Sequence, residues 1–85
     1  MRENWKGNPL LDILKAHALT PSQLAIAAGV DYNLSYAVLN GYVQHLPWQF
    51  VDVIDNLDGK GTGDKVAKAY LLYRDGLAHR LLMKV

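Results

Sequence analysis

Apolar side chains recur every three or four residues along most of the chain, which is the spacing that places them on one face of an α-helix. The first such segment begins at Asn8-Pro9, because an asparagine side chain caps free amides and a proline at the first helical position loses no hydrogen bond. This segment is predicted to be a core-packing helix that runs to about Ala18. Its apolar face carries Leu10, Ile13, Leu14 and Ala18.

Two shorter helices are predicted next, separated by a turn of about three residues. The first begins at Thr20-Pro21-Ser22-Gln23, where the threonine and the glutamine form a capping-box pair. It ends near Ala28, and Gly29 supplies the positive φ that a helix end commonly needs. Asp31 caps the second helix, which stops at Asn40-Gly41. Two short helices joined this tightly must cross steeply.

The last two predicted helices differ in length. His45-Leu46-Pro47 opens a helix that closes at residues 56–59, and the glycine-rich segment 59–63 predicts a flexible connection. A long helix follows over 64–84, in which Gly76 marks either a close helix contact or a break. Its apolar stripe is wide, so we expect it either to pack on the domain and on a partner together or to leave an exposed patch of the kind that marks an interface. The stripe contains Val66, Tyr70, Tyr73, Leu77 and Leu81, broadened by Ala67, Leu71, Leu72, Ala78 and Leu82.

Composition limits the possible functions. The 85 residues, 51% hydrophobic and 20% charged, are enough for one folded domain and contain no cysteine. No run resembles a signal peptide or a membrane span, so we expect a cytoplasmic protein without a membrane partner. His17, His45 and His79 are scattered, and no acid–base or nucleophile arrangement is present. We therefore expect no metal, no cofactor and no enzymatic activity.

The two short helices carry the clearest functional signal. Small Ala25 lets the second helix cross the first, Gly29 makes the turn, and Val30 and Val38 anchor the pair. With these positions, residues 19–41 resemble the helix-turn-helix of the Cro-like (XRE-type) phage repressor family, and the likeness extends over 9–57 with the flanking helices. The resemblance implies an all-α, five-helix lambda-repressor-like DNA-binding domain over 1–85.

The resemblance also implies how residues would meet DNA. In that family the second helix of the motif lies in the major groove, and the first presents its N-terminus to a phosphate. Asn33 is the best candidate for reading sequence, since a carboxamide pairs bidentately with adenine. By position, the base-facing residues are Tyr32, Asn33, Tyr36 and Ala37, and the phosphate-binding residues are Ser22, Gln23 and Asn40.

The chain departs from the family in two ways. Ser35 stands where a branched aliphatic residue is usual, so we expect a weaker core anchor, burial shifted towards Leu34 and a rotated helix. Residues 16–59 contain no Lys or Arg, although phosphate neutralisation supplies most non-specific DNA affinity. A DNA-binding protein of this kind must use neutral donors or cations from its flanks. The acidic residues are Asp31, Asp52, Asp55 and Asp58, and the flanking cations are Arg2, Lys6, Lys15 and Lys60.

Two hypotheses remain. The leading one is a sequence-specific transcriptional regulator, a small phage or mobile-element repressor that binds a palindromic operator in double-stranded DNA as a homodimer, with the helix over 64–84 as the dimer element. The alternative is a protein-interaction module, an antirepressor or an inhibitor of another regulatory protein, that keeps the helix-turn-helix as a scaffold. It would bind through Tyr32, Tyr36 and Tyr42 or the C-terminal helix, and the low basic charge favours it.

Overall fold

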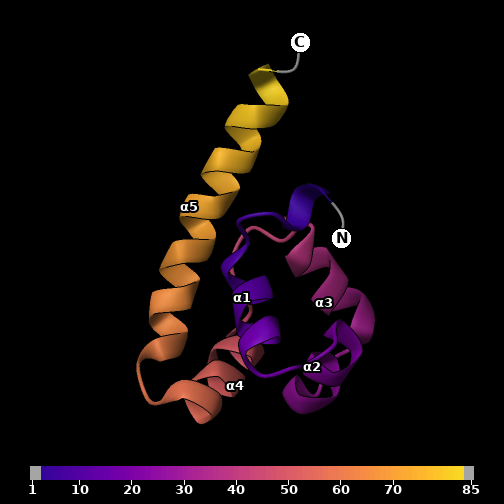
Figure 1. The fold of residues 1–85 in the computed structure, drawn as a ribbon, viewed down its shortest axis with the longest axis vertical. Helices are drawn as coiled ribbons and strands as arrows, with labels where there is room; N and C mark the ends of the chain where they lie inside the picture. Colours follow the sequence, from indigo (N-terminus) through magenta and orange to yellow (C-terminus); the bar gives the residue numbers. More distant parts are fainter. Residues whose placement is uncertain (1–2, 84–85) are drawn as a thin grey trace.

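The computed structural model describes residues 3–83, with the side chain of Glu3 excepted, and all regular elements in this range are helical. The predicted all-α class is confirmed. In Figure 1, α5 runs along one side of the molecule and the α2–α3 pair lies on the other. The predicted contribution of Arg2 and the predicted helix end at Lys84 lie outside the described residues. The elements are η1 (Glu3–Trp5), α1 (Pro9–Ala16), α2 (Pro21–Ala28), α3 (Tyr32–Leu39), α4 (Trp48–Asp58) and α5 (Thr62–Met83).

The residues predicted to cap the starts of helices, and the glycine predicted to end one, do so in the structure. The Asn8 side chain accepts from the Leu10 amide at 2.9 Å, and Thr20 and Gln23 form the full capping box. Gly29 ends α2 with φ of +69°, and Asp31 caps α3. Helix α1 ends at Ala16, two residues earlier than predicted. Local chemistry therefore defines most helix boundaries.

One core joins the helices. It contains Leu14 of α1, Leu24 of α2, Leu39 of α3, Phe50 of α4 and Tyr70 of α5, so every α-helix contributes to it. Several positions predicted to lie on apolar helix faces are instead exposed and outside the core. They are Ala18 after α1, and Leu71, Leu72, Ala78, Leu81 and Leu82 of α5. The buried cluster consists of Leu10, Leu14, Leu24, Val38, Leu39, Leu46, Phe50, Val53, Ile54, Tyr70, Tyr73 and Leu77.

The connection before α5 is shorter than the glycine-rich segment 59–63 predicts. Helix α5 already begins at Thr62, and Gly63 is buried against α4. The Gly63 amide donates to Asp55 Oδ1 at 2.8 Å, and a Cβ on Gly63 would lie 2.4 Å from the Val51 carbonyl oxygen. The glycine is needed because α5 starts in contact with the α4 backbone.

Gly76 has neither of the two roles predicted for it within one copy of the chain. Helix α5 is continuous from Thr62 to Met83, so there is no break. Gly76 is exposed, and a Cβ there would meet nothing within 4 Å, so no other helix of the described chain approaches it. Both expectations are wrong for the isolated domain.

Ser35 occupies the core position in spite of its polar side chain. It is fully buried while Leu34 is half-buried, so the expected shift of burial and rotation of α3 are wrong. The Ser35 hydroxyl has no hydrogen-bond partner among the described residues. Val38 and Leu39, both fully buried, provide the apolar contacts that fix the orientation of α3.

Helix α5 extends beyond the body of the domain, as its last turns in Figure 1 show. Its 22 residues span about 33 Å, most of the 40 Å longest dimension of the molecule. No helix within residues 3–83 combines the length and the apolar character needed to cross a membrane.

Candidate nucleic-acid interface

The turn between α2 and α3 brings the start of α3 to the surface. Gly29 and Val30 close the end of α2, where the Val30 amide donates to the Ala25 carbonyl at 3.0 Å. Ala25 is buried, which lets α3 pack closely on α2. Asp31 then accepts from the Asn33 amide at 3.0 Å and starts α3. The start of α3 is therefore fixed by the Asp31 cap, while Tyr32 and Asn33 are exposed.

Six of the seven predicted DNA-contacting residues retain accessible side chains. We call the four on α3, which are Tyr32, Asn33, Tyr36 and Ala37, the α3 surface. Tyr32 and Asn33 are exposed, while Tyr36 and Ala37 are half-buried. Ser22 and Gln23, at the start of α2, are also exposed. These residues belong to two helices that are in direct contact.

Gln23 is held in one orientation by the capping box. Its Oε1 accepts from the Thr20 amide at 2.9 Å, and its own amide donates to Thr20 Oγ1 at 3.1 Å. The side-chain nitrogen is left to donate outward at the N-terminus of α2. A neutral donor in this place suits an anion, because the helix end carries a partial positive charge.

Asn40 lies elsewhere than predicted. It is only 6% exposed, and its Oδ1 accepts from the Trp5 indole N–H at 2.9 Å. Its backbone carbonyl accepts from the Asn4 side chain at 3.4 Å. Asn40 therefore holds the N-terminal residues against the end of α3, and the predicted phosphate contact does not fit its burial.

Sequence reasoning missed the contribution of residues 3–8, which we call the N-terminal turn. The Trp5 and Tyr36 ring centroids are 5.9 Å apart, and Tyr36 meets Tyr32 edge-on at 6.0 Å. Three aromatic rings therefore form a row that begins in the N-terminal turn and ends at the tip of α3. No local signal could have revealed it, because Trp5 and Tyr36 are 31 positions apart.

Buried side chains also hold the C-terminal end of α3. Asn8 is fully buried, and its Nδ2 donates to the Val38 and Leu39 carbonyls at 3.0 Å each. From α5, the Tyr73 hydroxyl donates to the Asn4 and Leu39 carbonyls. Carbonyls that a helix end normally leaves free are thus satisfied by two other parts of the chain.

Two tyrosines of α5 act as neutral donors in this region. Burial raises the pKa of Tyr70 to about 12, and its hydroxyl donates to the Val43 carbonyl at 2.6 Å. Burial also raises the pKa of Tyr73. Both hydroxyls keep their protons at neutral pH, so the segment after α3 is tied to α5 by uncharged hydrogen bonds.

The acidic residues of segment 16–59 mostly serve the fold. Asp31 caps α3 and Asp55 accepts from Gly63, as described above. Asp58 pairs with His17 at 2.8 Å and joins the ends of α4 and α1. Asp52 is exposed on α4. These structural roles explain why the segment is acidic, but Asp31 still places a negative charge beside the α3 surface.

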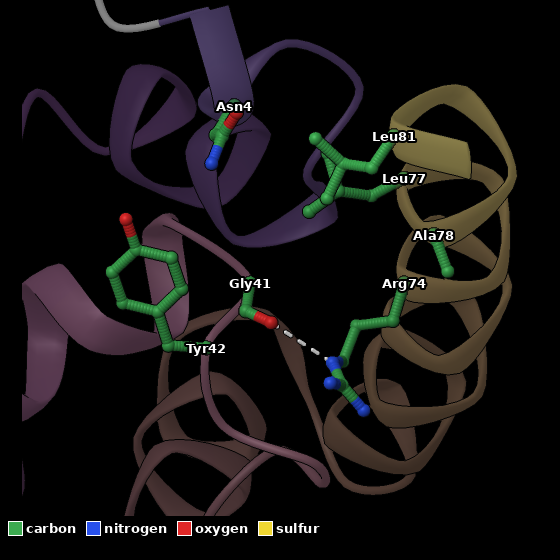
Figure 2. Close-up of a pocket in the computed structure, with 7 residues that line it drawn as sticks. All are labelled: Asn4, Gly41, Tyr42, Arg74, Leu77, Ala78 and Leu81. Atoms are coloured by element: carbon green, nitrogen blue, oxygen red, sulfur yellow. Dashed lines mark hydrogen bonds between the residues drawn. The ribbon is translucent and has the colours of Figure 1, made fainter. Parts of the chain in front are cut away.

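A pocket lies behind the end of α3, between the loop that follows it and α5 (Figure 2). The Arg74 Nε donates to the Gly41 carbonyl at 2.9 Å, and one Nη donates to the Gln44 carbonyl at 3.4 Å. The guanidinium thus fastens the loop to α5, and the rest of the wall is mainly apolar. The pocket has a volume of about 320 Å³ and is lined by Asn4, Gly41, Tyr42, Arg74, Leu77, Ala78 and Leu81.

Nothing in residues 3–83 resembles a metal centre, since no three His, Asp or Glu side chains gather there. Comparison of the chain with protein-family models, with curated proteins and with solved structures found no match.

Proposed function

We propose that the chain is a sequence-specific DNA-binding transcriptional regulator, a cytoplasmic repressor of the phage or mobile-element kind with a lambda-repressor-like helix-turn-helix. The observation that carries the proposal is the outward-facing first turn of α3, with Tyr32 and Asn33 exposed on a helix fixed by its cap and its core contacts. A rigid helix with exposed polar side chains at its N-terminal end suits entry into the major groove.

Each part of the surface has a distinct role in this proposal. Asn33 pairs with an adenine, Ala37 contacts a thymine methyl, and the tyrosine hydroxyls of the α3 surface bond to bases or phosphates. Ser22 and Gln23 bind a phosphate at the start of α2. Because segment 16–59 has no Lys or Arg, we expect weak binding with a shallow salt dependence.

Selection from random duplex DNA at about 50 mM salt tests this proposal. We expect enrichment of a palindrome, and a loss of about 1–3 kcal/mol per half-site when Asn33→Ala is titrated against it. The Asn33 side chain is exposed and makes no cap, so the variant should fold normally. Failure to enrich any sequence at this salt concentration would contradict DNA recognition.

Asp31→Asn provides the matched control on the same helix. Asparagine caps a helix as well as aspartate does, so α3 stays intact while one negative charge is removed beside the α3 surface. The variant should bind the enriched palindrome at least as tightly as the wild type. Weaker binding would mean that the Asp31 carboxylate itself contacts the DNA, which is unexpected because a carboxylate and a phosphate repel each other.

We also propose that the regulator is a homodimer formed through α5. The inner face of α5 belongs to the core through Tyr70, Tyr73 and Leu77, while Leu82 and Met83 at its projecting end are 75% and 71% exposed. Apolar side chains on a helix end beyond the domain are typical of an interface. Two-fold pairing would place two α3 helices about 34 Å apart, one turn of duplex DNA.

The combined change Leu82→Glu and Met83→Glu should convert the dimer into a folded monomer. Both side chains are exposed, so helix content and thermal stability should change little, whereas deleting α5 would remove part of the core. Analytical ultracentrifugation at micromolar concentration measures the result. Lys68→Glu, at an exposed position of the same helix, is the control and should remain dimeric. A double variant that stays dimeric would place the interface elsewhere.

A protein-interaction module, acting on another regulatory protein, is the second candidate. The composition of the α3 surface favours it, because tyrosines are enriched at protein–protein interfaces and the surface has no Lys or Arg to neutralise DNA phosphates. The same DNA selection distinguishes the two. If no duplex is enriched, Tyr32 and Tyr36 become the first positions to vary in a search for a protein partner.

A further inference from the structure

We infer that the N-terminal turn is part of the DNA-binding surface, where Trp5 positions Tyr36 and Lys6 supplies the phosphate contact that the α2–α3 pair lacks. This inference rests on the proposed function and adds residues that the helix-turn-helix alone does not contain. It concerns residues 3–8, in which the sequence alone indicated only a helix cap at Asn8 and a flanking cation at Lys6.

The N-terminal turn is fastened to α3 at several points. The Trp5 indole N–H donates to Asn40 Oδ1 at 2.9 Å, and Asn8 Nδ2 donates to the last two carbonyls of α3. The Tyr73 hydroxyl also donates to the Asn4 carbonyl. Figure 1 shows η1 beside the end of α3. The turn and α3 therefore present one continuous surface.

Trp5 contacts the half-buried base-facing tyrosine directly. Its ring is 5.9 Å from that of Tyr36 at an interplanar angle of 42°, and Tyr36 in turn meets Tyr32 edge-on. Such contacts limit the rotamers that a surface tyrosine can adopt, which fixes where its hydroxyl points. Trp5 thus acts as a positioning residue for the α3 surface.

Lys6 follows Trp5 in the chain and is exposed, so its ammonium is accessible to a phosphate next to this surface. The other two described flanking cations lie on other parts of the fold. Lys15 is in the last turn of α1, and Lys60 is in the turn between α4 and α5, which lies at the bottom of the view in Figure 1, away from η1. Of these three lysines, Lys6 is the one whose place in the fold suits a phosphate beside α3.

Salt titration of the enriched duplex tests the role of Lys6. We expect Lys6→Gln to weaken binding on every sequence and to reduce the slope of log affinity against log salt by about one per half-site. Lys60→Gln is the matched control and should leave the slope unchanged. Equal slopes for the wild type and Lys6→Gln would overturn the inference while leaving the proposed function intact. If the wild type binds no duplex, both fall.

Selectivity tests the role of Trp5. The ratio of affinities for the enriched and a scrambled duplex is insensitive to partial unfolding, which lowers both affinities alike. We expect this ratio to fall several-fold in Trp5→Ala and to be largely retained in Trp5→Phe, which keeps a ring against Tyr36. An unchanged ratio in Trp5→Ala would show that Trp5 serves stability alone and would overturn its positioning role.

A fluorescence measurement locates the N-terminal turn in the complex. The chain has two tryptophans, and Trp48 is 69% exposed, so Trp48→Phe should fold and leave Trp5 as the sole tryptophan, whose emission is excited selectively at wavelengths that tyrosine does not absorb. We expect bound duplex to protect Trp5 from acrylamide quenching. Quenching that stays the same once the complex has formed would place the turn away from DNA and contradict the inference.

Discussion

Gly63→Ala is expected to destabilise the domain by about 2–4 kcal/mol, a large part of the roughly 5–10 kcal/mol that holds a chain of this length folded. The added Cβ would lie 2.4 Å from the Val51 carbonyl oxygen and 2.8 Å from Asp55 Oδ1. A backbone carbonyl inside α4 cannot move aside as a flexible side chain can. Helix α5 would therefore shift and weaken its contacts with the core. Urea unfolding measures the loss.

Gly76→Ala is the matched control on the same helix. Gly76 is exposed, and the methyl group of an alanine there would have no neighbour within 4 Å. Only helix propensity changes, so we expect a gain of about 0.5–1 kcal/mol. The two substitutions should therefore change the unfolding free energy in opposite directions, because Gly63 is buried against α4 and Gly76 is exposed. A Gly63→Ala protein as stable as the wild type would contradict the α4–α5 contact. A loss in Gly76→Ala would show that another surface lies against α5 there.

The sequence predicted the parts of the fold that depend on neighbouring residues. Asn8, Thr20 and Asp31 each cap the helix that follows them, and Gly29 turns the chain, because each acts within two or three positions. Apolar spacing likewise predicted most of the core. The same reasoning failed at Gly63, since its buried contact with Val51 depends on how two helices pack.

In the candidate site, too, the sequence predicted what depends on neighbouring residues and missed what depends on distant ones. The exposure of Tyr32 and Asn33 follows from their places on a capped helix, so the sequence could predict it. The burial of Asn40 could not be predicted, because its partner Trp5 lies 35 positions away. The ring contact of Trp5 with Tyr36 was missed for the same reason. Composition predicted the shortage of cations, whereas only the fold shows which lysine lies beside α3.

The other large effect is expected at Asn8, where one buried amide joins the start of α1 to the end of α3. Asn8→Asp keeps the acceptor for the Leu10 amide but replaces the donor to the Val38 and Leu39 carbonyls with a second oxygen. A buried, uncompensated charge then faces two carbonyls. We expect a loss of about 3–5 kcal/mol at pH 7, measured by urea unfolding relative to the wild type.

The pH dependence separates this cause from a simple loss of packing. Burial would raise the folded-state pKa of the new carboxyl above its unfolded value of about 3.9, since the protonated form can donate to one carbonyl. The stabilisation that the protonated carboxyl provides is therefore complete below the unfolded-state pKa and is lost as the pH rises through the folded-state pKa.

Asn8→Ala removes the same hydrogen bonds without adding a titratable group, so its loss of unfolding free energy relative to the wild type should not vary with pH. We therefore expect Asn8→Asp to be the more stable of the two variants near pH 3.5 and the less stable at pH 7. If the two variants had the same order of stability at both pH values, the hydrogen bonds that Asn8 donates to the end of α3 would not be what it contributes.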